Sequence, residues 1–135
     1  MKLFCSNAVT GEDEALVKRR MRLVAETLNA AGHEAYCPVF DLHQNELVAQ
    51  GDIKAVMLYD FDNIRSRDGV IVVVASPRKS EGQLMEVGAA LAAGKPIYLF
   101  MHESAMQTSS HLPKVAQRIF SWQTNDDLIT NLKQI

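Results

Sequence analysis

The chain has 135 residues, with 14 basic and 16 acidic side chains and a formal net charge of −2. This length suits a single domain over residues 1–135, and the near-neutral charge argues against a nucleic-acid partner. No apolar run approaches the ~20 residues of a membrane span and no secretion signal follows the first Met, so we expect a cytoplasmic protein without a membrane partner.

Apolar patterning predicts five strands that alternate with helices. Runs of β-branched and aromatic residues mark the strands, and apolar residues at helical spacing mark the helices. Residues 39–51 and 104–110 give no clear pattern and are expected to be loops, the first with one short helix. In chain order we expect a strand at 2–5, a helix ending near 31, a strand at 34–37, a helix from 52 to about 67, a strand at 70–75, a helix at 82–93, a strand at 96–100, a short helix near 112–117, a strand at 119–122 and a last helix to about 133.

Capping side chains predict where the three longest helices begin. Thr10 and Asp13 are spaced as a capping box for the first helix. Asp52 suits the N-cap of the second helix, and Ser80 with Gln83 suits the start of the third.

The alternation of strands and helices predicts an α/β fold, with a parallel sheet covered by helices on both faces. The continuous Val and Ile run at 70–75 suits a strand that is buried on both faces. In such sheets ligands bind at the carboxyl ends of the strands, near the point where the strand order switches. We therefore expect the functional site in the loops that follow the strands at 2–5 and 70–75.

Asp60 lies in the middle of the apolar stripe of the helix from residue 52. It comes four residues after Val56, three after Met57 and four before Ile64. A carboxylate in such a place must be paired, protonated or open to a cavity. The pattern supports two interpretations equally: a structural Asp that accepts hydrogen bonds from neighbouring backbone, and a functional acid with a raised pKa.

Glu86 is the only charged residue between Gly82 and Gly94, and its helical neighbours are small. The small neighbours allow another group to come close, and a place near the helix start favours the ionised carboxylate. A favourable surface charge at a helix start explains Glu86 alone equally well. Together with Asp60, however, the contrast in surroundings predicts an acid and a nucleophile, the pair that displacement with retention at an anomeric carbon requires.

The residues around these carboxylates also carry a family resemblance. Asp60 is followed eight residues later by Asp68, which opens a strand, and Ser80-Glu81-Gly82-Gln83-Leu84-Met85-Glu86 places a Ser six residues before the Glu. In these motifs the chain resembles the nucleoside 2-deoxyribosyltransferase superfamily, which includes the 2′-deoxynucleoside 5′-monophosphate N-glycosidases. The resemblance covers most of residues 2–100.

The resemblance implies a flavodoxin-like (Rossmann-like) fold with a five-stranded parallel sheet of order 2-1-3-4-5, and neither a metal nor an organic cofactor. It implies that Glu86 attacks C1′ of a sugar and that Asp60 binds the leaving base and helps to protonate it. A nucleoside or nucleotide substrate would lie against Ser6, Asn7, Ser80 and Gly82. The resemblance also implies a homodimer or a larger homo-oligomer.

Two departures leave the reaction type open. Ser80 stands where the transferases usually carry Asp and the N-glycosidases carry Ser, which favours a 5′-monophosphate and water as the acceptor. Residues 7–10 lack the Arg that the N-glycosidases use for phosphate, although Arg78 and Lys79 could substitute for it. A non-catalytic nucleotide-sensing or protein-interaction domain on the same fold is the alternative from another class, and it would bind nucleotides without releasing free base.

Overall fold

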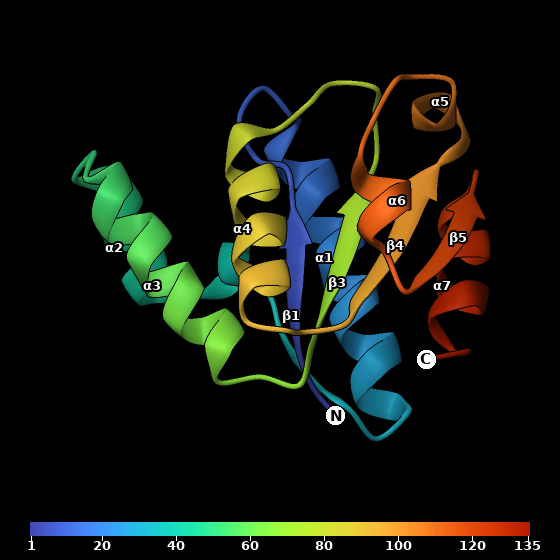
Figure 1. Cartoon of the computed structure of the whole chain (residues 1–135), viewed down its shortest axis with the longest axis horizontal. Helices are drawn as coiled ribbons and strands as arrows, with labels where there is room; N and C mark the ends of the chain where they lie inside the picture. Colours follow the sequence, from blue (N-terminus) through green and yellow to red (C-terminus); the bar gives the residue numbers. More distant parts are fainter.

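The computed structural model describes residues 1–135 and contains a sheet of five parallel strands. Its strand order is β2-β1-β3-β4-β5, which confirms the predicted order and fold class. All five strand tips point to the same edge of the sheet, the upper edge in Figure 1. The strands are β1 (Lys2–Asn7), β2 (Glu34–Tyr36), β3 (Gly69–Val74), β4 (Ile97–His102) and β5 (Arg118–Trp122).

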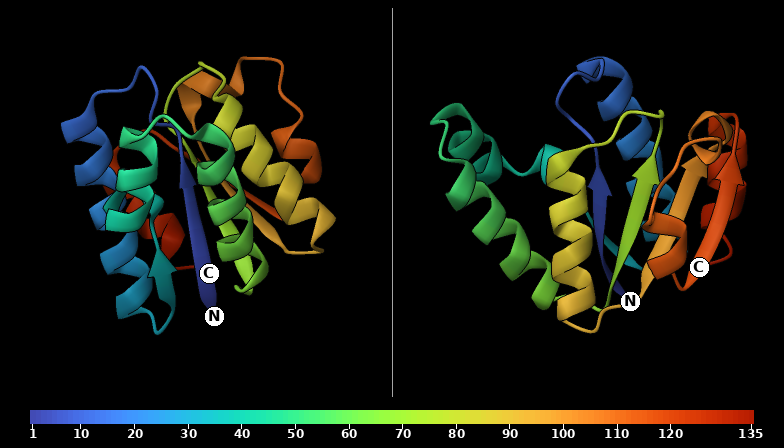
Figure 2. Two further views of the ribbon diagram at one scale, coloured as in Figure 1. Left: turned by 90° about the vertical axis from the view of Figure 1, so that its left-hand side faces the viewer. Right: turned by 45° about the horizontal axis from the view of Figure 1, so that its top comes forward.

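Helices cover both faces of the sheet (Figures 1 and 2). One face carries α1 and α7, and the other carries α4, against which α3 and then α2 pack. None of the helices combines the length and the apolar character needed to cross a membrane. The helices are α1 (Glu14–Ala30), the 3-10 helix η1 (Pro38–Phe40), α2 (Leu42–Ala49), α3 (Ile53–Arg65), α4 (Glu81–Ala92), α5 (Glu103–Met106), α6 (Leu112–Val115) and α7 (Asn125–Leu132).

The core consists of two apolar layers, one on each face of the sheet. Successive side chains of a strand point to opposite faces, so β3 contributes Ile71 and Val73 to the layer under α1 and α7. Val70, Val72 and Val74 point to the layer under α4. Every residue of β3 is buried, as the continuous Val and Ile run predicts for a central parallel strand.

The helix starts follow the predicted caps with one exception. Asp13 alone caps α1, where its carboxylate accepts from the Leu16 N–H at 3.0 Å. The predicted capping box with Thr10 was wrong, because the helix starts directly after Asp13 and Thr10 lies three residues before this N-cap. Asp52 and Ser80 cap α3 and α4, each accepting from the backbone N–H three residues later.

The short helix expected within residues 39–51 is present as α2, and the loop expected at 104–110 also contains part of a short helix. Residues 39–51 form most of η1 and all of α2, because Pro38 favours the first turn and the Asp41 carboxylate caps the second helix. Residues 104–110 begin inside α5, whose N–H at Ser104 is accepted by the His102 ring. Helix α2 matters for function, since it forms one wall of the cleft described below.

Candidate active site

A cleft of about 630 Å³ opens at the carboxyl ends of β1 and β3, where the sequence pattern places the site. Its walls come from the loops after these strands and from η1, α2, α3 and the first turns of α4. The volume lies within the range of small-molecule sites. Five of the six predicted site residues line this cleft: Asn7, Asp60, Ser80, Gly82 and Glu86.

Asp60 and Glu86 are brought together by the packing of α3 on α4. The two side chains are nearly buried, with exposed fractions of 2% and 6%. Their carboxyl groups lie close enough for each to shift the pKa of the other. Asp60 lies on the buried face of α3 with Val56, Met57 and Ile64, as the apolar stripe predicts, and it faces a cavity and a second carboxyl group.

Burial raises the pKa of both carboxyl groups. The pKa of Asp60 rises to about 6, mainly through burial, although hydrogen bonds from Gln44 and Glu86 act in the opposite direction. The pKa of Glu86 rises to about 8, through burial and then through repulsion by Asp60, against a hydrogen bond from Ser6. Between these values the pair holds one proton, which rests on Glu86, the group with the higher pKa.

The expectation that the helix dipole keeps Glu86 ionised was therefore wrong. Helix α4 begins at Glu81, so Glu86 lies in its second turn, where the effect of the dipole has fallen off. Burial and the neighbouring Asp60 outweigh what remains of it.

Polar side chains from β1 and α2 fix the orientation of the pair. Ser6 Oγ donates to Glu86 Oε1 at 2.7 Å, and Gln44 Nε2 donates to Asp60 Oδ2 at 3.3 Å. The other oxygens, Asp60 Oδ1 and Gln44 Oε1, are buried and have no hydrogen-bond partner in the chain. Two acceptors are thus left free beside the cleft.

The two predicted residues of β1 take different places. Asn7 lines the cleft, and its side-chain amide donates to the Ala8 carbonyl at 3.1 Å. Ser6 is fully buried and lies outside the cleft wall. Its side chain points to α4 and supports Glu86 from behind, so direct contact with a substrate, as the resemblance implies, is not what the structure provides.

Ser80 and Gly82 form the rim of the cleft at the start of α4. Ser80 Oγ accepts from the Gln83 N–H at 3.2 Å, which leaves its own O–H free to donate. A Cβ added at Gly82 would meet no atom within 4 Å, so glycine keeps this part of the cleft open. Arg78 donates to the carbonyls of the loop after β1, whereas Lys79 beside it has no polar partner in the chain.

The family model described as nucleoside 2-deoxyribosyltransferase matches residues 4–125, which span all five strands and the whole cleft. The chain belongs to the nucleoside 2-deoxyribosyltransferase family. No curated protein sequence gives a significant match.

Solved structures show the same fold at low sequence identity. The CMP N-glycosidase BcmB of Clostridium botulinum has a TM-score of 0.67 and 19% identity, covering 98% of both chains. A 2-deoxyribosyltransferase of Bacillus psychrosaccharolyticus has a TM-score of 0.62 and 16% identity, covering 98% of this chain and 96% of the other. A conserved protein of Enterococcus faecalis V583 has a TM-score of 0.59 and 15% identity, covering 98% of this chain and 97% of the other.

Within this member of the nucleoside 2-deoxyribosyltransferase family, Asp68 of the resemblance motif lies away from the cleft. Its carboxylate accepts from the Lys2 N–H at 2.7 Å, at the amino ends of the strands. It therefore joins the start of β1 to the start of β3 and takes no part in the site. No three His, Cys, Asp or Glu side chains are grouped in a way that could hold a metal ion.

Two glutamines complete the site, and the sequence pattern assigned neither of them to it. Gln83 was expected in a capping box, but its amide donates instead to the carbonyls of Ser6 and Val73, tying α4 to the ends of β1 and β3. Gln44 lies in the segment without a clear pattern. The available signal was Asp41 three residues earlier, a spacing typical of a helix start.

Proposed function

We propose that the protein cleaves the N-glycosidic bond of a nucleoside or its 5′-monophosphate through a covalent glycosyl intermediate on Glu86. The observation that carries this proposal is the buried Asp60–Glu86 pair, which faces a cleft of nucleotide size. Such a pair holds one proton at neutral pH and so supplies one acid and one nucleophile. Membership of the nucleoside 2-deoxyribosyltransferase family supports the same reaction class.

In the first step the Glu86 carboxylate attacks C1′ while the bond from C1′ to the base nitrogen breaks. The proton that rests on Glu86 in the free protein first moves to Asp60, and the departing base nitrogen then takes it from Asp60. Asp60 Oδ1 is suited to hold this proton because it has no other partner. The Ser6 hydroxyl stabilises Glu86 once the carboxylate is ionised.

In the second step an acceptor attacks C1′ of the glycosyl ester and releases the Glu86 carboxylate. The Asp60 carboxylate takes the proton of the acceptor, which restores the pair to its starting state. Water as acceptor gives the free sugar, and a second base gives a new nucleoside.

A 5′-monophosphate with water as acceptor is the version that the rim of the cleft favours. The Ser80 hydroxyl is free to donate, and Lys79 and Arg78 bring two positive charges to the same rim. Hydroxyl and cationic donors of this kind bind phosphate oxygens well. These residues take over the role of the Arg that is missing from residues 7–10.

A chromatographic assay for free base tests the proposal. The protein is incubated with 2′-deoxynucleosides, ribonucleosides and their 5′-monophosphates, with and without a second base, beside Glu86→Gln, Asp60→Asn and a control, Glu103→Gln, on the exposed start of α5. We expect base release in the unchanged protein and the control, and its loss in the other two variants. Nucleotide binding with no base release from any substrate would refute the reaction and favour the sensing domain.

We also propose that residues 1–135 act as one domain and that this domain self-associates. Large apolar side chains lie exposed on α2 and α3, among them Leu42, Ile53 and Leu58. A homodimer or larger assembly would remove such a surface from water. Sedimentation velocity at micromolar concentration tests this, and a monomer at all concentrations would exclude it.

A further inference from the structure

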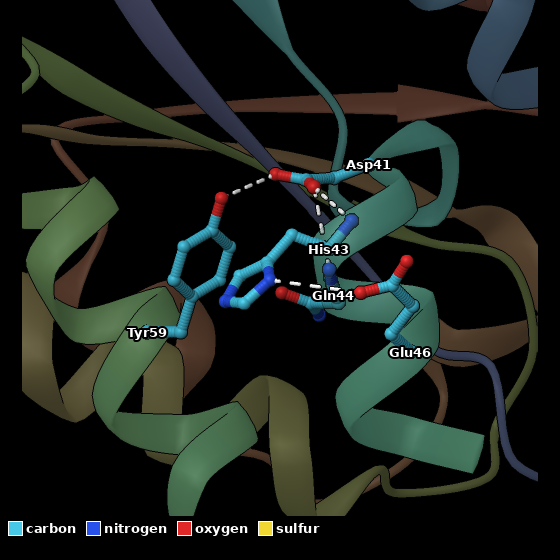
Figure 3. Close-up of polar contacts among 5 residues, drawn as sticks. All are labelled: Asp41, His43, Gln44, Glu46 and Tyr59. Atoms are coloured by element: carbon cyan, nitrogen blue, oxygen red, sulfur yellow. Dashed lines mark hydrogen bonds and ion pairs between the residues drawn. The ribbon is translucent and has the colours of Figure 1, made fainter. Parts of the chain in front are cut away.

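A second polar cluster is centred on Asp41 at the start of α2, and Figure 3 shows Asp41 between Tyr59 and the first residues of this helix. Asp41 Oδ2 accepts from the hydroxyls of Tyr36 and Tyr59 at 2.6 and 2.7 Å. Its Oδ1 accepts from the backbone N–H groups of His43 and Gln44 at 2.9 and 3.3 Å. One carboxylate therefore joins the end of β2, the start of α2 and the middle of α3.

The charges in this cluster support these hydrogen bonds. Burial opposes ionisation of Asp41, but the bonds from Tyr36, Tyr59 and the two N–H groups outweigh it and lower its pKa. Burial, followed by the bond to Asp41, raises the pKa of Tyr36, and the bond to Asp41 raises the pKa of Tyr59. The carboxylate stays ionised and the tyrosines stay protonated, so both bonds are charge-assisted.

Helix α2 has no buried apolar face. Gln44 is its only buried residue, and Leu42 at its start is 78% exposed. Amphipathic helices are normally held by an apolar face, which α2 lacks. Polar and ring contacts therefore join α2 to the rest of the chain: the Asp41 hydrogen bonds, the Gln44–Asp60 bond and the edge contact of the His43 ring with Tyr59.

The position of α2 matters because Gln44 donates to Asp60 of the carboxyl pair. The segment from Asp41 to Gln44 thus connects the tyrosine cluster to the proposed acid. The titratable groups that act on Asp60 are Glu86 from α4 and Asp41 from the start of α2, and Tyr36 and Tyr59 lie on the far side of Asp41.

We propose that Asp41, clasped by Tyr36 and Tyr59, is a positioning residue that holds α2 against α3 and thereby keeps Gln44 bonded to Asp60. Its effect on catalysis rests on the proposed function, whereas its effect on α2 does not. None of the three side chains lines the cleft, so they act through Gln44.

We call the hydrogen bonds of Tyr36 and Tyr59 to Asp41 the clasp. The test compares two ways of breaking it. Asp41→Ala removes the carboxylate, and the double variant Tyr36→Phe/Tyr59→Phe removes only the two hydroxyls and keeps the cap of α2. Two matched controls make the same kinds of substitution elsewhere in the chain. Asp13→Ala removes the N-cap of α1 on the other face of the sheet, and Tyr98→Phe removes the hydroxyl of a core tyrosine that has no hydrogen bond to this cluster.

Hydrogen exchange of the α2 amides is the first readout and needs no substrate. We expect residues 42–49 to exchange roughly tenfold faster or more in both clasp variants, because each variant loses charge-assisted hydrogen bonds. We expect α2 exchange in both controls to match the unchanged protein. If Asp41→Ala does not fold, the double tyrosine variant carries the test, and unchanged α2 exchange in that variant would overturn the proposal.

The second readout is the titration of the Asp60 carboxyl carbon by NMR, with Gln44→Ala as the reference. Loss of the Gln44 hydrogen bond removes an influence that lowers the pKa of Asp60, so we expect this carboxyl to titrate at higher pH in Gln44→Ala and in the double tyrosine variant. Asp41→Ala also removes a negative charge that raises the pKa of Asp60, so the two effects oppose each other and this variant is judged by α2 exchange alone. If the α2 amides exchange faster while the Asp60 titration stays unchanged, then α2 does not act on Asp60 and the inference is overturned.

Activity separates this inference from the proposed function. If the protein releases base, the acidic limb of kcat/KM should move to higher pH in the double tyrosine variant and stay in place in both controls. If no substrate releases base, the proposed function fails, while exchange and the Asp60 titration still decide whether the clasp positions α2.

Discussion

Replacement of Glu86 by Gln should stabilise the folded protein, and increasingly so as the pH rises. Burial raises the pKa of Glu86 from 4.5 to about 8 in the folded chain. The folded state therefore binds more protons than the unfolded state between these values, and stability falls as the pH rises through this window. The glutamine side chain introduced by Glu86→Gln has the same shape, accepts from Ser6 and donates to Asp60, but it cannot ionise.

The size of the effect follows from the pKa shift. Each pKa unit corresponds to about 1.4 kcal/mol. Linkage then gives a stabilisation by Glu86→Gln of about 1 kcal/mol at pH 5, about 3 kcal/mol at pH 7 and about 4 kcal/mol at pH 8. A gain of this size from loss of a proposed nucleophile is typical of sites whose chemistry needs a strained group.

Urea unfolding followed by circular dichroism measures this difference at pH 5, 7 and 8. Glu81→Gln is the matched control, since it makes the same substitution at an exposed carboxylate on the same helix. A Glu86→Gln difference that is the same at pH 5 and pH 8 would refute the reasoning, because it would mean that burial does not perturb the carboxyl group.

Three further outcomes follow from the site. The pH profile of kcat/KM should be bell-shaped with limbs near pH 6 and pH 8, because both carboxyl groups are protonated below the acidic limb and both are ionised above the basic limb. A profile that stays flat across this range contradicts the shared proton. Ser6→Ala removes a donor to Glu86, so the basic limb should move to higher pH and kcat should fall roughly tenfold or more, the usual cost of a hydrogen bond to a charged group; an unmoved basic limb would show that Ser6 does not act on Glu86. Gly82→Ala should raise the urea midpoint slightly, since alanine loses less backbone entropy than glycine in a helix and its Cβ meets nothing, but it should raise KM by crowding the substrate; an unaltered KM would place the substrate elsewhere.

Local patterns in the sequence predicted the strands and most helix ends, because these depend on neighbouring residues alone. The Val and Ile run of β3, the Asp52 and Ser80 caps and the alternation of strands with helices were sufficient for the fold class. Asp60 and Glu86 could be selected as candidates because each breaks the pattern of its own helix. The strand order was predicted from the family resemblance, because no local sequence pattern specifies which strands lie side by side.

Only the tertiary structure decided how these groups act on each other. The shared proton arises from the packing of α3 on α4 and from burial, neither of which is visible in the pattern of one helix, so the expected ionisation of Glu86 was wrong. Ser6 lies behind Glu86 because β1 and α4 pack together across 80 residues of sequence. The hydrogen bonds at Asp41 could not be predicted from the sequence for a related reason. Helix α2 is held by polar contacts to β2 and α3, so its sequence has no apolar periodicity that would indicate how it packs. Sequence thus determined which elements form, while long-range packing determined which side chains share protons and hydrogen bonds.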